Sequence, residues 1–117
     1  MLEFELPYPP SVNHYWRRVG ARTLISRGGR AFRQAVCAIL AAGKVKPLSG
    51  PLELVITVFP PDRRRRDVDN TMKSLLDAMQ HGGAYHDDSQ IIRLSIERGS
   101  VTPGGKTVVQ IREVKPS

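Results

Sequence analysis

Hydrophobic and polar residues alternate along four stretches of this chain, and apolar residues recur at helical spacing along two others. The alternating stretches are residues 2–6, 52–59, 92–96 and 107–114. Period-two alternation is typical of a half-buried strand, so we expect each of these stretches to be a β-strand. Residues 30–42 and 68–79 carry apolar side chains every three or four positions, which predicts two amphipathic helices.

Glycines and turn residues mark where these elements end. Gly43 follows the first predicted helix and Gly82-Gly83 follows the second. Asp69 or Asn70 can serve as the N-cap of the second helix. Residues 102–105 (Thr-Pro-Gly-Gly) predict a hairpin turn, so we expect the last two strands to pair with each other in antiparallel fashion.

Residues 11–30 show neither pattern. They are polar, basic and aromatic, and they end in the Gly28-Gly29 pair, which predicts a long ordered loop or a loose hairpin. The element order is therefore β-α-β-α-β-β, with this loop before the first helix. We expect an α+β (mixed α/β) fold, a single small domain over residues 1–117, in which two helices pack on one face of a four-stranded mixed sheet.

Basic residues are concentrated in the first half of the chain. The formal net charge is +7, and residues 1–50 hold eight Lys or Arg against two acids. Six arginines and no acid lie between Asn13 and Arg33. A strongly basic chain is typical of a nucleic-acid-binding protein, although a basic surface can also serve solubility alone. Arginine favours nucleic acid, because its planar guanidinium group suits phosphate.

Acidic residues are clustered as well. Six of the eleven, all of them aspartates, fall within residues 62–88. The single cysteine excludes a disulfide framework and a cysteine-based zinc site. No apolar run could span a membrane and no signal-peptide pattern is present, so we expect a soluble, cytoplasmic protein without a membrane partner. The gathered carboxylates indicate a cation site inside a phosphate-binding surface.

The densest part of this cluster lies between the second strand and the second helix. Asp67 and Asp69 are two residues apart, and in an extended segment this spacing puts both carboxylates on one side, with Val68 on the other. Mg²⁺ binds through a few carboxylates together with a substrate phosphate. Asp87 and Asp88, at the start of the third strand, can supply a further carboxylate if that strand lies beside the second. The alternative is helix capping, which needs only one acid.

Basic residues accompany these carboxylates. Lys73 lies one helical turn after Asp69, where it can neutralise charge on a scissile phosphate; the alternative is an ion pair with Asp69 or Asp77. Residues 63–66 are four consecutive arginines, which are expected to hold a phosphodiester. The arginines that we expect to contact DNA are Arg17, Arg18, Arg22, Arg27, Arg63, Arg64, Arg65 and Arg66.

Several motifs resemble those of the RusA-type Holliday junction resolvases. Residues 6–15 (LPYPPSVNHY) resemble the N-terminal signature of that family, and residues 61–70 (PDRRRRDVDN) resemble its active-site signature. Residues 83–90 (GAYHDDSQ) resemble its second acidic motif, and residues 101–105 (VTPGG) its last hairpin. The similarity runs nearly end to end, and the DRRRRDVDN string with the later pair of aspartates is its most specific part.

The resemblance implies a chemistry for these residues. Members of the family are homodimers that bind four-way DNA junctions, need Mg²⁺ or Mn²⁺, and make paired nicks whose ends a ligase can seal. The essential carboxylates of the family fall here on Asp67, Asp69 and Asp88, and the essential lysine falls on Lys73. Asp87 matches a neighbouring acid, which we regard as auxiliary.

The sequence thus predicts a Mg²⁺-dependent, structure-specific endodeoxyribonuclease that resolves Holliday junctions in DNA recombination and repair. The expected partners are four-way junction DNA and a second copy of the chain, and no small-molecule cofactor is expected. Asp67, Asp69 and Asp88 are predicted metal ligands, and Lys73 is a further catalytic residue. The alternatives are a non-catalytic basic nucleic-acid-binding module and a metal-dependent nuclease that acts on another DNA structure.

Overall fold

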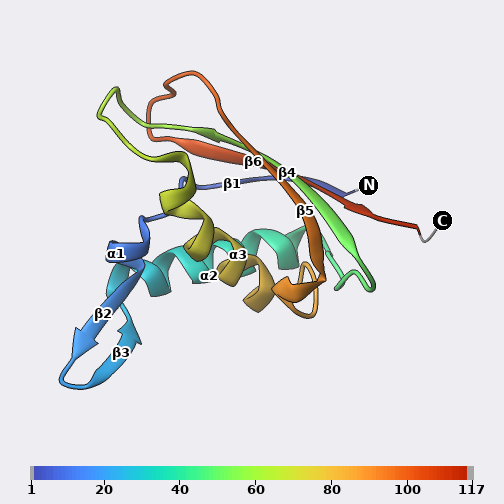
Figure 1. The fold of residues 1–117 in the computed structure, drawn as a ribbon, viewed down its shortest axis with the longest axis horizontal. Coiled ribbons are helices and arrows are strands. Elements are labelled where there is room, and N and C mark those ends of the chain that lie inside the picture. The colour runs from blue at the N-terminus through green and yellow to red at the C-terminus, as the bar shows by residue number, and fades with distance from the viewer. Residues whose placement is uncertain (1, 116–117) are drawn as a thin grey trace.

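A sheet and a layer of two helices make up most of the computed structural model, which describes residues 2–115 without the side chains of Val12 and Asn13. The elements are β1 (Leu2–Leu6), α1 (Val12–Tyr15), β2 (Trp16–Val19), β3 (Arg22–Ile25), α2 (Arg27–Ala42), β4 (Leu52–Phe59), the 3-10 turn η1 (Val68–Thr71), α3 (Met72–His81), the 3-10 turn η2 (Asp88–Gln90), β5 (Ile91–Arg98) and β6 (Lys106–Glu113). Helices α2 and α3 lie on one face of a four-stranded sheet (Figure 1), which confirms the predicted α+β fold. None of the described helices is long and apolar enough to cross a membrane.

Alternation along the strands accounts for the core. Every second residue of β4, from Leu52 to Val58, is buried, and so are Val109 and Ile111 of β6. These side chains pack against the apolar stripes of the two helices. The helical members of the core are Phe32, Val36, Leu40, Met72, Leu75, Ala78 and Met79. The strands bury every second residue and the helices bury a stripe that repeats every 3.6 residues. These buried faces therefore form one apolar layer between the sheet and the helices.

The strand order, β1-β6-β4-β5, differs from the predicted pairing of the last two strands. β6 pairs antiparallel with β1 and β4, whereas β5 pairs parallel with β4, so the expectation of a β5–β6 hairpin is wrong. The connection over residues 99–105 is too long to impose a tight hairpin. β6 is buried at alternate positions and takes a central place, while β5 carries Arg93, Glu97 and Arg98 and takes the edge.

Residues 16–25, within the segment expected to be a long loop or a loose hairpin, form a hairpin. After the short helix α1, β2 pairs antiparallel with β3, from Trp16 opposite Ile25 to Val19 opposite Arg22. Gly20 has a φ of 61° at the first central position of the turn, where a two-residue hairpin of type II′ requires glycine. The hairpin extends beyond the helix layer at the lower left of Figure 1.

Both helices begin at points other than those predicted. α2 starts at Arg27 because the Ser26 hydroxyl caps it, accepting from the Gly29 amide at 2.9 Å. Gly29 therefore lies inside the first turn, where an added Cβ would come within 2.4 Å of the Tyr15 carbonyl oxygen. The second predicted helix is split into η1 and α3, so Asp69 lies inside the 3-10 turn and is not an N-cap.

Candidate active site

Asp67 and Asp69 lie just before α3, in the segment that leaves β4. Asp67 has an extended backbone (φ −82°, ψ 135°), and the chain then turns into η1, where the Asn70 amide donates to the Asp67 carbonyl at 3.2 Å. Only Asp67 is therefore extended, and Asp69 lies inside the 3-10 turn that follows, so the extended segment expected to place both carboxylates on one side does not form. Both aspartates are exposed, and among the described residues neither carboxylate has a hydrogen bond or an ion pair. The chain leaves these two charges available.

Two neighbouring hollows open beside Asp67. The larger, of about 540 Å³, is lined by Tyr8, Ser11, His14, Arg64, Arg65, Arg66, Asp67, Asn70 and Thr71. The smaller, of about 330 Å³, shares Tyr8, Arg64, Arg66 and Asp67 with it. Because arginines line both, a phosphodiester can bind in either next to the free carboxylate. A hollow of about 810 Å³ between the α2–β4 connection and the end of β6 contains none of the predicted site residues.

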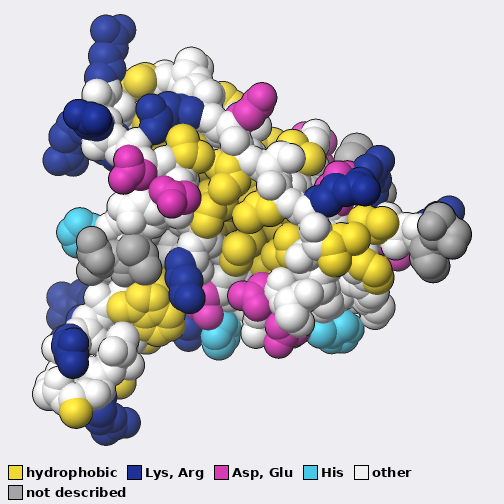
Figure 2. Space-filling model, viewed as in Figure 1, with side chains coloured by type: hydrophobic (Ala, Val, Ile, Leu, Met, Phe, Trp, Pro, Cys, Tyr) yellow, Lys and Arg dark blue, Asp and Glu magenta, His cyan; other side chains and the backbone are white. Residues whose placement is uncertain are grey.

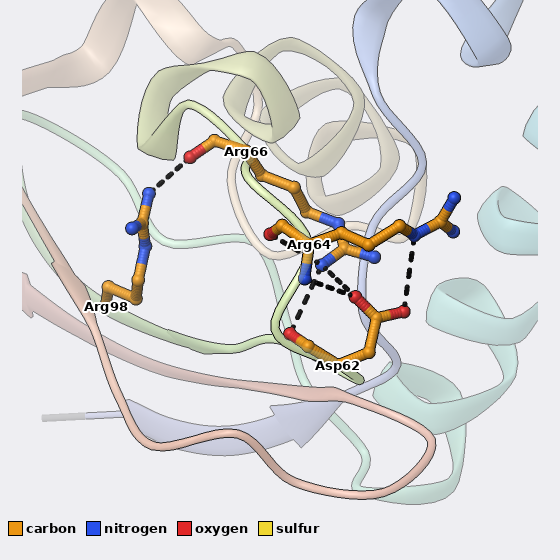
Figure 3. A network of polar contacts seen from close by, with 4 residues as sticks. All are labelled: Asp62, Arg64, Arg66 and Arg98. Atoms are coloured by element: carbon orange, nitrogen blue, oxygen red, sulfur yellow. Dashed lines mark hydrogen bonds and ion pairs between the residues drawn. The ribbon is translucent and has the colours of Figure 1, made fainter.

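One acid, Asp62, organises the arginine run (Figure 3). Asp62 accepts hydrogen bonds from Arg66 Nη1 at 2.7 Å and from the Arg64 backbone amide at 2.9 Å. The hydrogen bond from Arg66, followed by that from the Arg64 amide, lowers the pKa of Asp62 to about 2. The Arg66 guanidinium lies 5.8 Å from the centroid of the Tyr8 ring, and the Arg66 carbonyl accepts from Arg98. The loop before Asp67 and Asp69 is thus held by three contacts, in which Asp62, Tyr8 and Arg98 take part.

The four arginines therefore differ in role. The side chain of Arg66 is 23% exposed and is bound within the chain, whereas that of Arg64 is 81% exposed. Arg63 and Arg65 are exposed as well. Three of the predicted DNA contacts face solvent, and Arg66 chiefly shapes the loop. The i,i+4 spacing of Asp62 and Arg66 is the signal that sequence reasoning missed, because it counted Asp62 only as part of the acidic cluster.

Lys73 is exposed on the first turn of α3. In the part of the chain that the structure describes, it has no ion pair with Asp69 or Asp77, which were the alternatives to a catalytic role. Asp77 instead accepts from Arg33 Nη2 at 2.8 Å and from the hydroxyl of the buried Tyr15. Burial, with this hydrogen bond to Asp77, raises the pKa of Tyr15 to about 12. Sequence reasoning did not find this triad, which ties the base of the hairpin to α2 and α3.

The arginines of residues 11–30 are also exposed. Arg17 and Arg18 lie on β2 and Arg22 on β3, all outside the helix layer. Arg27 lies in the first turn of α2, which contains no acidic residue. A cation there is opposed by the helix dipole, so it does not stabilise the helix. Its position beside the hairpin is better suited to binding an anion.

The second acidic motif lies at the other end of α3. Asp88 begins η2, and its backbone amide donates to Gln80 Oε1 at 2.9 Å, in the last turn of the helix. The ten residues of α3 span about 15 Å and separate this point from Asp69. β5 does lie beside β4, as expected, but the strands are parallel, so the start of β5 is far from the loop that follows β4.

Asp87 has a structural task. Its carboxylate accepts from the Ser89 amide at 2.8 Å, and the Gln90 side chain accepts from the Asp87 amide, which completes a capping box. The hydrogen bond from the Ser89 amide lowers the pKa of Asp87. Its auxiliary role in catalysis therefore stays a prediction, beside a capping role that the structure shows.

The carboxylates that one chain offers to a metal, among the described residues of this loop, are those of Asp67 and Asp69. Within residues 2–115, no three His, Cys, Asp or Glu side chains are grouped closely enough to hold a metal ion. Asp67 and Asp69 fit Mg²⁺, because this ion binds through one or two carboxylates and completes its shell with water and phosphate. Asp88 does not join them within the chain.

Comparison with known proteins places the chain in a family. The model of the family "Endodeoxyribonuclease RusA" matches residues 7–112, nearly the whole chain. The chain belongs to the RusA family. It is 40% identical over 114 residues to a crossover junction endodeoxyribonuclease of Enterobacteria phage HK97, covering 97% of this chain and 95% of the relative. The RusA protein of Escherichia coli K12 is 37% identical over 110 residues, 93% and 92% of the two chains.

Membership of the RusA family confirms the assignment made from the sequence motifs. The matched region includes the carboxylate loop, α3 and both motifs that contain aspartate pairs. The matched range also spans the hairpin β2–β3. The matches cover nearly all of each of these two relatives.

Proposed function

We propose that this RusA-family protein is a Mg²⁺-dependent, structure-specific endodeoxyribonuclease that resolves four-way DNA junctions by paired, symmetric nicks. The observation that carries the proposal is the free carboxylate pair, Asp67 and Asp69, of which Asp67 lines two hollows that arginines also line. The relatives named crossover junction endodeoxyribonuclease support junction DNA as the substrate and recombination and repair as the setting. DNA as the substrate agrees with the predicted cytoplasmic location.

The metal of this proposal is Mg²⁺, for which Mn²⁺ can substitute. Asp67 and Asp69 would hold it, with Asp88 as the third carboxylate. When bound, the ion offsets negative charge on the scissile phosphate and lowers the pKa of a water molecule. Asp67 and Asp69 supply oxygen donors, which suit a hard cation such as Mg²⁺.

The residues of the chain would act on the phosphate in a simple order. Arg64 and Arg65 hold the phosphodiester against the loop, whose shape the Asp62–Arg66 ion pair maintains. A water attacks phosphorus in line with the leaving oxygen and loses a proton to solvent, while the P–O bond to that oxygen breaks and the oxygen takes up a proton from solvent. Lys73 donates a hydrogen bond to the phosphate oxygens as negative charge accumulates on them. The products are nicked strands whose ends a ligase can join.

A homodimer fits the exposed edge of the sheet. β5 is an edge strand, and Leu94 and Ile96 lie opposite Leu54 and Ile56 of β4, on the side that faces the helices. Leu94 is nevertheless 40% exposed and Ile92 56% exposed, and an apolar band crosses this face in Figure 2. An apolar patch beside an open strand edge is typical of a contact between subunits. A two-fold dimer would match the two-fold symmetry of an open junction.

The dimer would also resolve the separation of the carboxylates. Asp88 begins η2, the turn directly before β5, so pairing of two copies along this edge carries Asp88 of one copy toward the surface of the other. We propose that the third carboxylate of each site reaches Asp67 and Asp69 in this way. The nuclease would then be active only as a dimer.

Cleavage assays test the proposal and its alternatives. Purified protein is incubated with a four-way junction, a fork and a linear duplex of the same arm sequence, with Mg²⁺, with Mn²⁺ and with EDTA. We expect paired nicks in the junction alone, abolished by EDTA and restored by either metal. Binding without cleavage under all conditions would support the non-catalytic module. Equal cleavage of fork or duplex would support a nuclease for another DNA structure.

A further inference from the structure

The hairpin β2–β3 has an apolar tip that the fold does not use. Residues opposite each other in an antiparallel pair share a face, so Val19 and Leu24 lie on one face of the ribbon together with Arg17 and Arg22. Val19 is 44% exposed and Leu24 is 36% exposed. Basic side chains and an apolar side chain mark the end of the hairpin at the lower left of Figure 2. A short, projecting ribbon that exposes apolar side chains between arginines is suited to an anionic partner with an apolar surface.

The shape of the ribbon fits DNA. A two-stranded ribbon can enter the major groove, which is about 12 Å wide. Arg18 lies on the face opposite Arg17 and Arg22, so both faces of the ribbon carry a cation toward flanking phosphates. A second copy of the chain is a poor partner for the same surface, because the two sets of arginines would repel each other.

The position of the hairpin relates it to the carboxylate loop. Its base is α1, whose residue His14 lines the same 540 Å³ hollow as Asp67. The Tyr15–Arg33–Asp77 contacts hold this base against α2 and α3. Each strand of the ribbon has four residues and is about 13 Å long, which corresponds to about four base-pair steps. DNA with its phosphate at Asp67 would therefore meet the tip within a few base pairs.

We propose that the β2–β3 hairpin recognises the branch point of the junction, with Val19 and Leu24 against base-pair faces that are exposed there and stacked inside a duplex. The inference rests on the proposed function and names the element that distinguishes a junction from its arms. Groove edges and phosphates are present in any duplex, so the arginines alone do not discriminate. Apolar wedges that pack against unstacked bases are a known means of recognising deformed DNA.

The test measures binding in EDTA, so it does not depend on cleavage. Dissociation constants are measured for a four-way junction and for a duplex of the same arm sequence, and 2-aminopurine at the branch reports unstacking. The variant carries Val19→Ser and Leu24→Ser. Val55→Ser is the control, because Val55 is exposed to a similar extent, 38%, on the sheet. The variant Val19→Leu keeps an apolar tip.

We expect the double variant to lose about tenfold of its preference for the junction over the duplex, with duplex affinity unchanged and less 2-aminopurine fluorescence. Val55→Ser and Val19→Leu should retain the preference. An unchanged preference in the double variant overturns the inference, as does an equal loss on both DNAs, which would indicate an ordinary groove contact. A change in sedimentation of the DNA-free protein would show that the tip binds a second copy, and it also overturns the inference.

The proposed nuclease function and the inference about the hairpin can fail separately. A wild-type protein that prefers junctions but does not cut them in Mg²⁺ contradicts the nuclease, while the hairpin variant still decides the branch-point contact. A wild-type protein that cuts junctions, with a double variant that retains the preference, removes only the inference. Wild-type protein without any preference for junctions contradicts both.

Discussion

The two acidic segments at opposite ends of α3 differ in how the chain uses their charge. At the C-terminal end, Asp87 caps η2 and its carboxylate accepts from the Ser89 amide. At the N-terminal end, Asp67 and Asp69 are exposed, and among the described residues their carboxylates have no partner. Their neighbour Asp62 is bound by Arg66. Among the described residues, the acids that shape loops, Asp62 and Asp87, are thus hydrogen-bonded, whereas the carboxylates of Asp67, Asp69 and Asp88 have no hydrogen bond or ion pair.

This difference shows how structural and functional carboxylates can be separated within one motif. A bound carboxylate stabilises the local backbone, and its removal should loosen a turn. A free carboxylate beside another adds repulsion to the folded chain, so its presence is better explained by a cation that binds there. The comparison predicts that substitutions at the free pair affect chemistry, while those at Asp62 and Asp87 act through geometry.

The largest expected effect is at the free pair and at Asp88. Asp67→Asn, Asp69→Asn and Asp88→Asn should each lower the rate of junction cleavage by about a thousandfold or more, because each removes a proposed metal ligand. Junction affinity should be unchanged or higher, since a negative charge near the DNA phosphates is removed. Single-turnover cleavage and gel-shift titration measure both. A variant that cleaves within about tenfold of wild type would remove that residue from the ligand set.

A mixing experiment sharpens the contrast between the two ends of α3. Asp67→Asn and Asp88→Asn proteins, each inactive alone, are combined and allowed to exchange subunits. If a site takes Asp67 from one copy and Asp88 from the other, the mixed dimer has one intact site, and nicking of one strand should return. Continued inactivity, with exchange verified by differently tagged subunits, would contradict a site shared between copies.

A smaller effect is expected at Asp62, which acts through the loop. Asp62→Asn should slow cleavage about tenfold at saturating junction, because the loop that carries Asp67 is less firmly held. The control is Glu113→Gln, which removes one exposed negative charge at the end of β6, away from the proposed dimer edge. Similar losses of cleavage rate in both variants would mean that the removed negative charge, and not the loop contact, slows cleavage.

The pH dependence of stability provides an independent measure of the Asp62 contact. The pKa of Asp62 is lowered from 3.8 to about 2, so its contribution to folding is fully present above about pH 4 and is lost as the pH falls toward 2. The melting temperature of wild type should therefore exceed that of Asp62→Asn at pH 7, and the two should converge toward pH 2. A difference at pH 2 as large as that at pH 7 would contradict an ionic role.

The smallest effect is expected at the hairpin arginines. Arg17→Ala with Arg18→Ala should make the dependence of log K on log salt shallower by about one unit for each phosphate that the variant no longer neutralises. Affinity should fall alike for junctions of every sequence, because phosphate contacts position the protein without reading bases. Salt titrations of binding measure the slope. A wild-type slope in the double variant would mean that these arginines serve solubility only.

Local pattern was sufficient for most of the elements and for the family. The alternation of β4, the helical stripe of α2 and the stop at Gly82 follow from neighbours in sequence, and the structure confirms them. The free pair Asp67 and Asp69 could be predicted in the same way, because its signal lies within one short segment. The DRRRRDVDN string carried the resemblance that the comparisons confirm.

The pairing between strands that are distant in the sequence could not be predicted from neighbouring residues. β6 lies between β1 and β4 because its buried side chains, Thr107, Val109 and Ile111, fill the centre of the sheet, and no adjacent residue specifies this. The parallel register of β4 and β5 then places Asp88 at the far end of α3. Sequence alone therefore determined which residue types are present and in which local elements. Only the tertiary structure decided which carboxylates lie together, because strand order depends on burial summed over the whole sheet.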